Sequence, residues 1–201
     1  GRYVVNAARF ADKVMLIDAA AGTSDLGRVM GVVNLYEGAQ PCDMTTLPDG
    51  SYAFTPDRGG ETISVFSLDP FELVVTAPLE RMGEEPLQPF MATVSPRGDM
   101  LFVENARDRS VSAIDVRDPA HPVEARRFLV ADGLLAEGAI TDEFTPDGRY
   151  NCIICRNASA LTVVDIDRLE IIGQVPFPEG SNPIAGTFTP EGNRMFVPLP
   201  G

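Results

Sequence analysis

The sequence predicts an all-β protein of the β-propeller class, with about four four-stranded blades arranged as an arc. Two observations lead to this prediction. A turn motif recurs along the chain at nearly constant spacing, and short apolar strand patterns keep a fixed register with it. No segment shows a sustained helical spacing of apolar residues. Four-stranded antiparallel units that repeat every ~40–50 residues are typical of propeller blades.

The recurring motif is a proline, a charged residue and a glycine, at intervals of 48, 50 and 44 residues. Proline presets φ, aspartate bonds back to its own backbone, and glycine accepts a left-handed conformation, so the motif predicts a β-hairpin turn. Residues 1–3 repeat residues 148–150, which predicts that the chain starts within a fifth copy. The four complete copies are Pro48-Asp49-Gly50, Pro96-Arg97-Gly98, Pro146-Asp147-Gly148 and Pro190-Glu191-Gly192.

Positions on both sides of the turn keep the same register. The residue 17 positions after each glycine closes a β-rich run, at Asp18, Ser67, Asp115 and Asp165. Seven positions before the turn proline stand Pro41, Pro89 and Pro183, with Ala139 as the exception. We therefore expect four strands, A to D, in each repeat, with the proline–glycine turn joining strand A to strand B. The expected repeats are 1–47, 48–95, 96–145 and 146–189, and residues 190–201 start the next blade.

One copy closely resembles a known repeat. Phe102-Val103-Glu104-Asn105, followed by residues 111–115, has the pattern aromatic-Val-x-Asn and then Val-x-x-Ile-Asp. Together with the proline and the turn, this resembles the YVTN-type β-propeller repeat over essentially the whole chain. The resemblance implies a propeller, usually of seven blades, and a periplasmic or extracellular location. Similar repeats occur in haem d1 nitrite reductases, in the heavy subunit of methylamine dehydrogenase and in lactonases, so no single activity is implied.

The predicted strands do not add up to a closed ring. The chain begins and ends in a B strand, so it holds four A strands and five B strands. In a closed ring of four blades, two B strands would compete for the same position in one blade. We therefore expect that the rest of the propeller, roughly three blades, lies outside this sequence. The alternative is closure by pairing with a second copy.

Charge and composition argue against several partners. The formal net charge is −13, with acids spread along the chain, which disfavours nucleic acid or an anionic membrane as partner. No apolar run approaches the ~20 residues of a membrane span. The three cysteines cannot form a complete disulfide framework, and Cys152 and Cys155 have no second C-x-x-C to complete a zinc site. The residues of this chain support no particular cofactor.

The B–C loops and D–A connections are expected on one rim, where functional residues of rigid β scaffolds concentrate. Arg9, Arg58 and Arg156 share one position of the repeat, and Arg107 is adjacent to it in the third copy. One interpretation is an arginine ring that binds a carboxylate or phosphate through forked hydrogen bonds. The other is a set of solvated loop arginines, each paired with a nearby acid.

Three further rim candidates lie at strand ends. Asn105 occupies the last position of strand B, which is Cys155 in the following repeat, and Cys42 follows the proline that starts strand A. A redox or metal role for a cysteine needs a cationic neighbour, and Arg156 is adjacent to Cys155. Ordinary packing is the alternative.

Two acids fall on the innermost strand, near the central channel. Asp142 and Glu143 stand where another copy carries Ala92 and Thr93. They could bind a cation or serve as a base, or they could face channel water. The single histidine, His121, belongs to a turn on the other rim, and the favoured rim has no histidine to act as an axial haem ligand.

Two functions are compatible with these residues. The first is a propeller scaffold or binding module that presents its rim to a protein partner or a small anionic ligand in an exported compartment. The second is part of a periplasmic redox enzyme, with a haem or metal over the channel mouth held by blades outside this chain. A lactonase-like hydrolase lacks a visible metal cluster or nucleophile–base pair. The sequence thus specifies an architecture without specifying a reaction.

Overall fold

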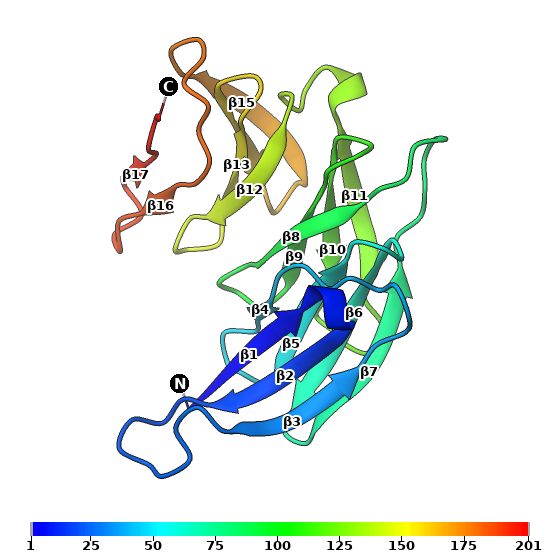
Figure 1. Cartoon of the computed structure of the whole chain (residues 1–201). Helices are drawn as coiled ribbons and strands as arrows, with labels where there is room; N and C mark the ends of the chain where they lie inside the picture. Colours follow the sequence, from blue (N-terminus) through cyan, green and yellow to red (C-terminus); the bar gives the residue numbers. More distant parts are fainter. Residues whose placement is uncertain (1, 201) are drawn as a thin grey trace.

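A computed structural model describes residues 2–200 as a succession of antiparallel β-sheets that follow one another along an arc (Figure 1). Strands pair in chain order within each sheet, which confirms the predicted all-β propeller architecture. The three central sheets have four strands each, and smaller sheets of three and two strands precede and follow them. Within residues 2–200, no helix has the length and apolar character needed to cross a membrane.

The bounds of the strands follow the repeat. The first sheet holds β1 (Tyr3–Ala8), β2 (Lys13–Asp18) and β3 (Val29–Asn34), with the 3-10 helix η1 (Arg9–Ala11) after β1. The second holds β4 (Thr45–Thr46), β5 (Tyr52–Asp57), β6 (Thr62–Leu68) and β7 (Phe71–Pro78). The third holds β8 (Pro89–Val94), β9 (Met100–Asn105), β10 (Ser110–Asp115) and β11 (Val123–Leu129), with the 3-10 helix η2 (Val130–Asp132) after it. The fourth holds β12 (Ala139–Phe144), β13 (Tyr150–Cys155), β14 (Ala160–Asp165) and β15 (Glu170–Pro176), and the last holds β16 (Thr187–Phe188) and β17 (Met195–Phe196).

The recurring turn motifs form the A–B hairpins, as predicted. Their glycines all have φ near +70°, the left-handed conformation that a hairpin of this kind requires. Three of these turns lie close to the turn before them: a Cβ at Gly98 would lie 3.4 Å from Pro48, one at Gly148 would lie 2.9 Å from Arg97, and one at Gly192 would lie 3.0 Å from Pro146. Gly1, the first glycine of the pattern, lies outside the described residues.

The hydrophobic core lies between sheets. One cluster joins Phe102 and Val111 of the third sheet to Phe144 and Ile153 of the fourth, and a second joins the second sheet to the third. The rings of Phe102 and Phe144 meet edge to face with centroids 5.3 Å apart. Each four-stranded sheet is therefore covered on both faces, which explains why its central strands are short apolar runs without strict alternation.

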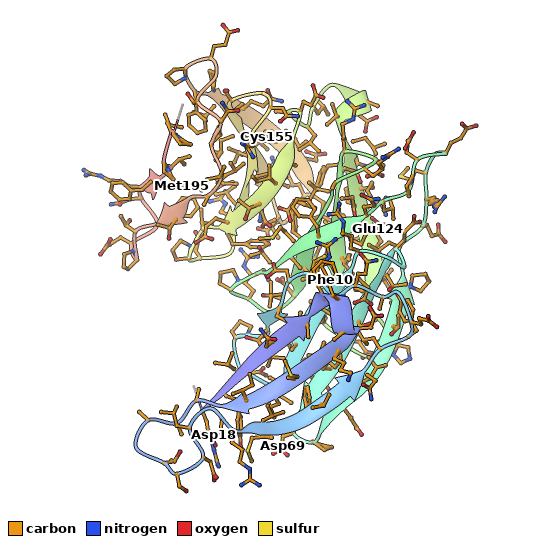
Figure 2. All side chains as sticks on the ribbon, in the orientation of Figure 1. Phe10, Asp18, Asp69, Glu124, Cys155 and Met195 are labelled. Atoms are coloured by element: carbon orange, nitrogen blue, oxygen red, sulfur yellow. The ribbon has the colours of Figure 1, made fainter. Side chains whose placement is uncertain are left out.

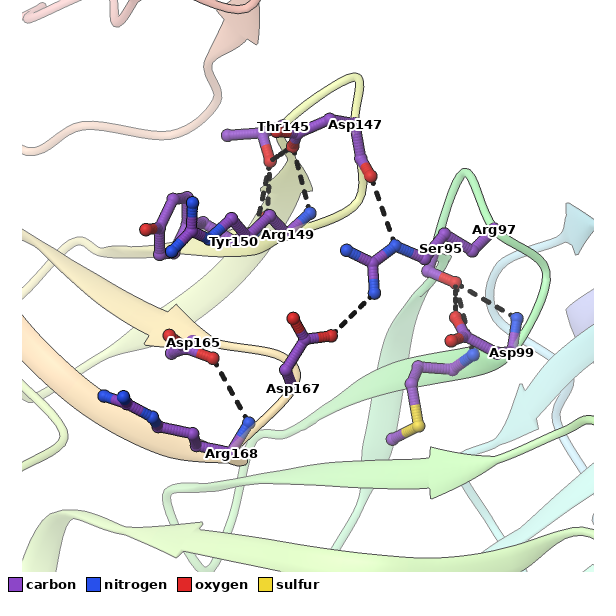
Figure 3. Close-up of polar contacts among 11 residues, drawn as sticks. Ser95, Arg97, Asp99, Thr145, Asp147, Arg149, Tyr150, Asp165, Asp167 and Arg168 are labelled. Atoms are coloured by element: carbon purple, nitrogen blue, oxygen red, sulfur yellow. Dashed lines mark hydrogen bonds and ion pairs between the residues drawn. The ribbon is translucent and has the colours of Figure 1, made fainter.

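Polar contacts join the third and fourth sheets at the hairpin rim (Figure 3). The Arg97 side chain donates to the Asp147 carbonyl at 3.2 Å and to the Asp167 carboxylate at 2.7 Å. Beside it, the Ser95 and Thr145 hydroxyls accept amide hydrogens within their own turns. The A strands lie innermost in each joint, since β8 packs against β4 and β5, and β12 against β8 and β9.

Candidate functional site

The rim opposite the hairpins is held together by backbone hydrogen bonds. The amide after each B strand donates to the D–A connection: Arg58 to the Gln40 carbonyl at 3.2 Å, Ala106 to the Gln88 carbonyl at 3.1 Å and Arg156 to the Gly138 carbonyl at 2.8 Å. The B–C loops and the D–A connections therefore share one rim, as expected.

Left-handed residues recur in the loops of this rim. In each D–A connection one of them stands directly before the position of the strand A proline in the repeat; these residues are Gln40, Gln88, Gly138 and Asn182. In the B–C loops they are Asp12, Glu61, Arg109 and Ser159. Most of these residues are not glycine, so the loop conformation itself is imposed by the backbone hydrogen bonds around it. The backbone positions from which the rim side chains extend are therefore fixed.

Asp12 fixes the first D–A connection. Its carboxylate accepts the Gly38 amide at 2.9 Å and the Gln40 amide at 2.8 Å. Those two backbone hydrogen bonds lower the pKa of Asp12. Asp12 therefore holds the connection against the first B–C loop, just before Cys42.

The arginines of the shared position lie at the rim, and two of them lie near Cys42. Arg9 opens η1, and Arg58 follows β5 on the next sheet. Both guanidinium groups act to lower the pKa of the half-buried Cys42 thiol, although burial prevails and raises it. Arg9, Arg58 and Cys42 therefore form one electrostatic group between the first and second sheets, which we call the rim cluster.

The rim cluster differs from Arg107 and Arg109 in its pairing. Arg107 pairs with Glu85 and Arg109 pairs with Glu137, each at 2.9 Å. Within residues 2–200, neither Arg9 nor Arg58 forms an ion pair, and the partner of Arg58 is the neutral amide of Gln88 at 3.1 Å. The Arg9 Nε is buried without a hydrogen-bond partner. Pairing with nearby acids thus accounts for Arg107 and leaves the rim cluster unexplained.

Arg156 stands apart from the rim cluster. It is exposed after β13 on the fourth sheet, and its side chain makes no ion pair within the described residues. In Figure 2, Phe10, which follows Arg9 in η1, is labelled at the end of the first sheet, and Cys155 is labelled within the fourth sheet. The Phe10 ring is 91% exposed, and the Arg9 guanidinium lies 5.3 Å from its centroid.

The last residue of strand B closes the B–C hairpin. Asn105 is buried and donates through Nδ2 to the hydroxyls of Ser110 and Ser112, at 3.0 and 2.9 Å. In the second sheet, Asp57 binds the equivalent strand C hydroxyls in the reverse direction, because its Oδ2 accepts from Thr62 and Ser64 at 2.9 and 2.6 Å. This position therefore has a structural part in every four-stranded sheet, and Asn105 does not reach the rim surface.

Cys155 occupies the same position in the fourth sheet. It is fully buried, and its sulfur lies 3.5 Å from the Thr162 hydroxyl. Burial raises the pKa of Cys155 to about 11, so the thiol is uncharged at neutral pH and Arg156 does not activate it. Cys152 is also buried, with its pKa raised to about 11.

Asp142 and Glu143 lie in different surroundings. Asp142 is 4% exposed and contacts Glu104 of the neighbouring sheet, so it does not face open channel water as the sequence left possible. Glu143 is half-buried, which raises its pKa. His121 lies on the hairpin rim, exposed, with Nδ1 2.9 Å from Asp118. Within residues 2–200, no three His, Cys, Asp or Glu side chains are grouped to hold a metal.

Comparisons with known proteins identify the fold. No family model and no curated protein matches the chain. Among solved structures, a functionally unknown protein from Desulfotomaculum acetoxidans superimposes with a TM-score of 0.78 at 15% identity, over 98% of this chain and 59% of that one. A putative 6-phosphogluconolactonase from Bacteroides uniformis gives 0.74 at 18% identity, over 98% and 60%. A periplasmic gluconolactonase from Pseudomonas aeruginosa gives 0.71 at 18% identity, over 87% and 51%.

The chain has the β-propeller fold. At these identities the likeness establishes the fold and does not extend to activity. The propeller chain spans between about half and three-fifths of the length of these three solved proteins.

Two buried carboxyl groups of the propeller are not singled out by the sequence. Glu104 stands inside the aromatic-Val-x-Asn pattern, and Asp57 is one of several acids beside a loop arginine. Both are completely buried. An acid within an otherwise apolar B strand is the one signal that could have directed attention to Glu104.

Proposed function

We propose that this part of the propeller is a binding module whose rim cluster takes a small anionic ligand with a carboxylate or phosphate group. The observation that carries the proposal is that Arg9 and Arg58, on adjacent sheets, both act electrostatically on Cys42, and that neither forms an ion pair within the described residues. Guanidinium groups bind carboxylate and phosphate oxygens through paired N–H donors.

The negative charge of the whole chain limits where an anion could bind, and it favours the site of these two arginines. The chain has a formal net charge of −13, so its general field repels anions. An anion would be held only where guanidinium groups act at short range. The buried Arg9 Nε lacks a hydrogen-bond acceptor, and a ligand oxygen would supply one.

The surroundings favour a ligand with an apolar part beside its anionic group. The exposed Phe10 ring lies against Arg9 and offers an apolar surface at the edge of the cluster. The resemblance to YVTN-type repeats, together with a periplasmic protein among the structural neighbours, supports an exported compartment. A protein partner whose acidic side chain enters the same cluster is the other form that this binding could take.

The test is titration of the chain with inorganic phosphate and with citrate, followed by calorimetry and by the backbone amide shifts of Gln40 and Arg58. We expect binding to weaken at least tenfold, about 1.4 kcal/mol, in Arg58→Gln and further in Arg9→Gln/Arg58→Gln. Ligand should also slow alkylation of Cys42, which is the most exposed of the three thiols.

The matched control is Arg107→Gln, on the same rim but paired with Glu85. It should bind both anions like the unmodified chain. Equal weakening in Arg107→Gln and Arg58→Gln would reduce the effect to general charge, and unchanged binding in the double variant would refute the proposed function.

A further inference from the structure

Two buried carboxyl groups meet in the joint between the third and fourth sheets. Glu104 of β9 has no exposed surface, and Asp142 of β12 is 4% exposed. Strand β12 packs directly against β9, and the two carboxyl groups meet across this contact, where both Glu104 oxygens and Asp142 Oδ1 are buried without a hydrogen-bond donor. The pair belongs to the inner part of the joint, away from the rim cluster.

The donors around the pair are distributed unequally. Asp142 accepts a hydrogen bond from the Asn151 side chain, and the Thr93 hydroxyl also favours its ionised form. Both oxygens of Glu104 lack any N–H or O–H donor among the described residues. An ionised carboxylate only accepts hydrogen bonds, so contact between these groups is favourable only when one of them carries a proton.

The neighbouring titratable groups add no compensating positive charge. Those that face the pair are Asp43 in the D–A connection before β4, Glu143 on β12 and Cys152 on β13. Asp43 is itself occupied by the amides of Met44 and Ala92, at 2.8 and 3.1 Å. Two ionised carboxylates without a cation are very unfavourable in an interior.

We propose that Glu104 and Asp142 hold one proton between them, with Glu104 as donor and Asp142 as acceptor, and that this proton makes the packing of the third sheet on the fourth depend on pH. The assignment follows from the donors, because Asp142 has partners that stabilise its charge and Glu104 has none. Burial and the neighbouring acid raise the pKa of Glu104 well above its ordinary value.

The sign of the pH dependence follows from proton uptake. In the unfolded chain both carboxyls release their protons near their ordinary pKa values, at about pH 4. The folded joint retains one proton above that pH. The folding equilibrium constant therefore falls about tenfold per pH unit until Glu104 ionises in the folded state, and levels off above that pH.

Infrared spectroscopy of the whole chain at pH 7 tests the shared proton directly. Because Asp57 also has a pKa of about 7, the spectra are recorded in an Asp57→Asn background. There we expect the carbonyl band of a protonated carboxyl group, absent once Glu104→Gln is added and retained with Glu143→Gln, a neighbouring acid on β12 outside the pair. The amide introduced by Glu104→Gln keeps an N–H donor toward Asp142, so this variant should fold. Between pH 7 and 8, the free energy of unfolding in urea should fall more steeply with rising pH in the unmodified chain than in Glu104→Gln, which keeps only the contributions of Asp57 and the buried thiols.

Three results would overturn the proposal. The first is a spectrum at pH 7 without the Glu104 band, and the second is a pH dependence of stability that Glu104→Gln leaves unchanged. The third is a stabilisation by Ca²⁺ that Glu104→Gln removes, because a cation would then take the place of the shared proton. Should Glu104→Gln fail to fold, Asp142→Asn gives a second test. The loss of the neighbouring charge should then shift the midpoint of the Glu104 band to lower pH, and an unshifted midpoint would contradict the pair.

Discussion

At the scale of single residues, Asp57 and Asn105 close equivalent hairpins with side chains of the same shape. Each lies at the end of strand B, contacts two hydroxyls of strand C and has a buried Oδ1 without a hydrogen-bond partner. They differ in charge. Burial raises the pKa of Asp57 to about 7, whereas Asn105 does not titrate. A protonated Asp57 is thus the closest equivalent of Asn105.

This equivalence predicts a pH-dependent part of the stability. The folded Asp57 holds its proton up to about pH 7, and the unfolded chain loses it near pH 4. Its contribution is therefore complete below about pH 4 and decreases as pH rises to about 7. Urea unfolding at pH 4.5 and at pH 7.5 measures how far the free energy of unfolding falls between these two pH values. This fall should be smaller by roughly 3 kcal/mol in Asp57→Asn than in the unmodified chain.

The converse substitution is the control. Asn105→Asp places a carboxyl in the same surroundings one sheet further on, so it should add a loss of stability between the same two pH values. If Asp57→Asn left the difference unchanged, Asp57 would be ionised in the folded chain and its burial would have to be compensated by another group.

At the scale of elements, the D–A connections repeat one backbone conformation with different residues. Gln40, Gln88 and Asn182 adopt the left-handed conformation with a side chain, and Gly138 adopts it at φ +82°. Gly138 has a further constraint, since a Cβ there would lie 2.7 Å from the Asn157 amide nitrogen. The glycine is therefore required by the close approach of the next loop as well as by φ.

We expect Gly138→Ala to lower the free energy of unfolding by about 1–3 kcal/mol, because it combines a left-handed alanine with a backbone clash. Gly173→Ala is the matched control. Gly173 lies in β15 without a positive φ, and a Cβ added there would meet no atom within 4 Å, so its replacement should be neutral or slightly stabilising. Equal effects in thermal unfolding would show that the Asn157 loop moves aside.

The elements were largely predictable and the site was less so. The turn glycines, the strand A prolines and the closing residue of strand C keep fixed spacings, because each performs the same backbone task in every copy. Contacts between repeats leave no such spacing. The approach of Arg9 and Arg58 to Cys42, the pairing of Arg107 with Glu85 and the meeting of Glu104 with Asp142 all join different sheets. Side chains that meet only after the sheets pack carry no periodic signal.

At the scale of the whole molecule, stability resides in the joints between sheets. The core clusters each draw residues from two consecutive sheets, as in other repeat architectures in which each unit contacts its neighbours. Phe102 is central to one joint, since it contacts Phe128 of its own sheet and Phe144 of the next. A change in a joint should therefore affect more than the sheet that carries it.

We expect Phe102→Ala to lower the free energy of unfolding by about 3–5 kcal/mol, through lost contacts and the cavity that remains. Phe10→Ala removes the same ring from a site that is 91% exposed and should change stability by less than about 0.5 kcal/mol. Urea unfolding followed by two probes would check both values. A small effect of Phe102→Ala would mean that the third and fourth sheets repack or unfold separately.

The backbone hydrogen bonds of the rim have a consequence for how this surface changes over time. The B–C loops and D–A connections are joined main chain to main chain, and the same left-handed conformations are met by glutamine, asparagine, serine, arginine and glycine. Apart from Asp12, Gly138 and the residue that ends strand B, the fold thus places few demands on the side chains there. Lineages can diversify the remaining surface with little cost in folding, and an engineer can graft new residues onto it, whereas the hairpin rim, with its fixed glycines close to the preceding turn, tolerates far less variation.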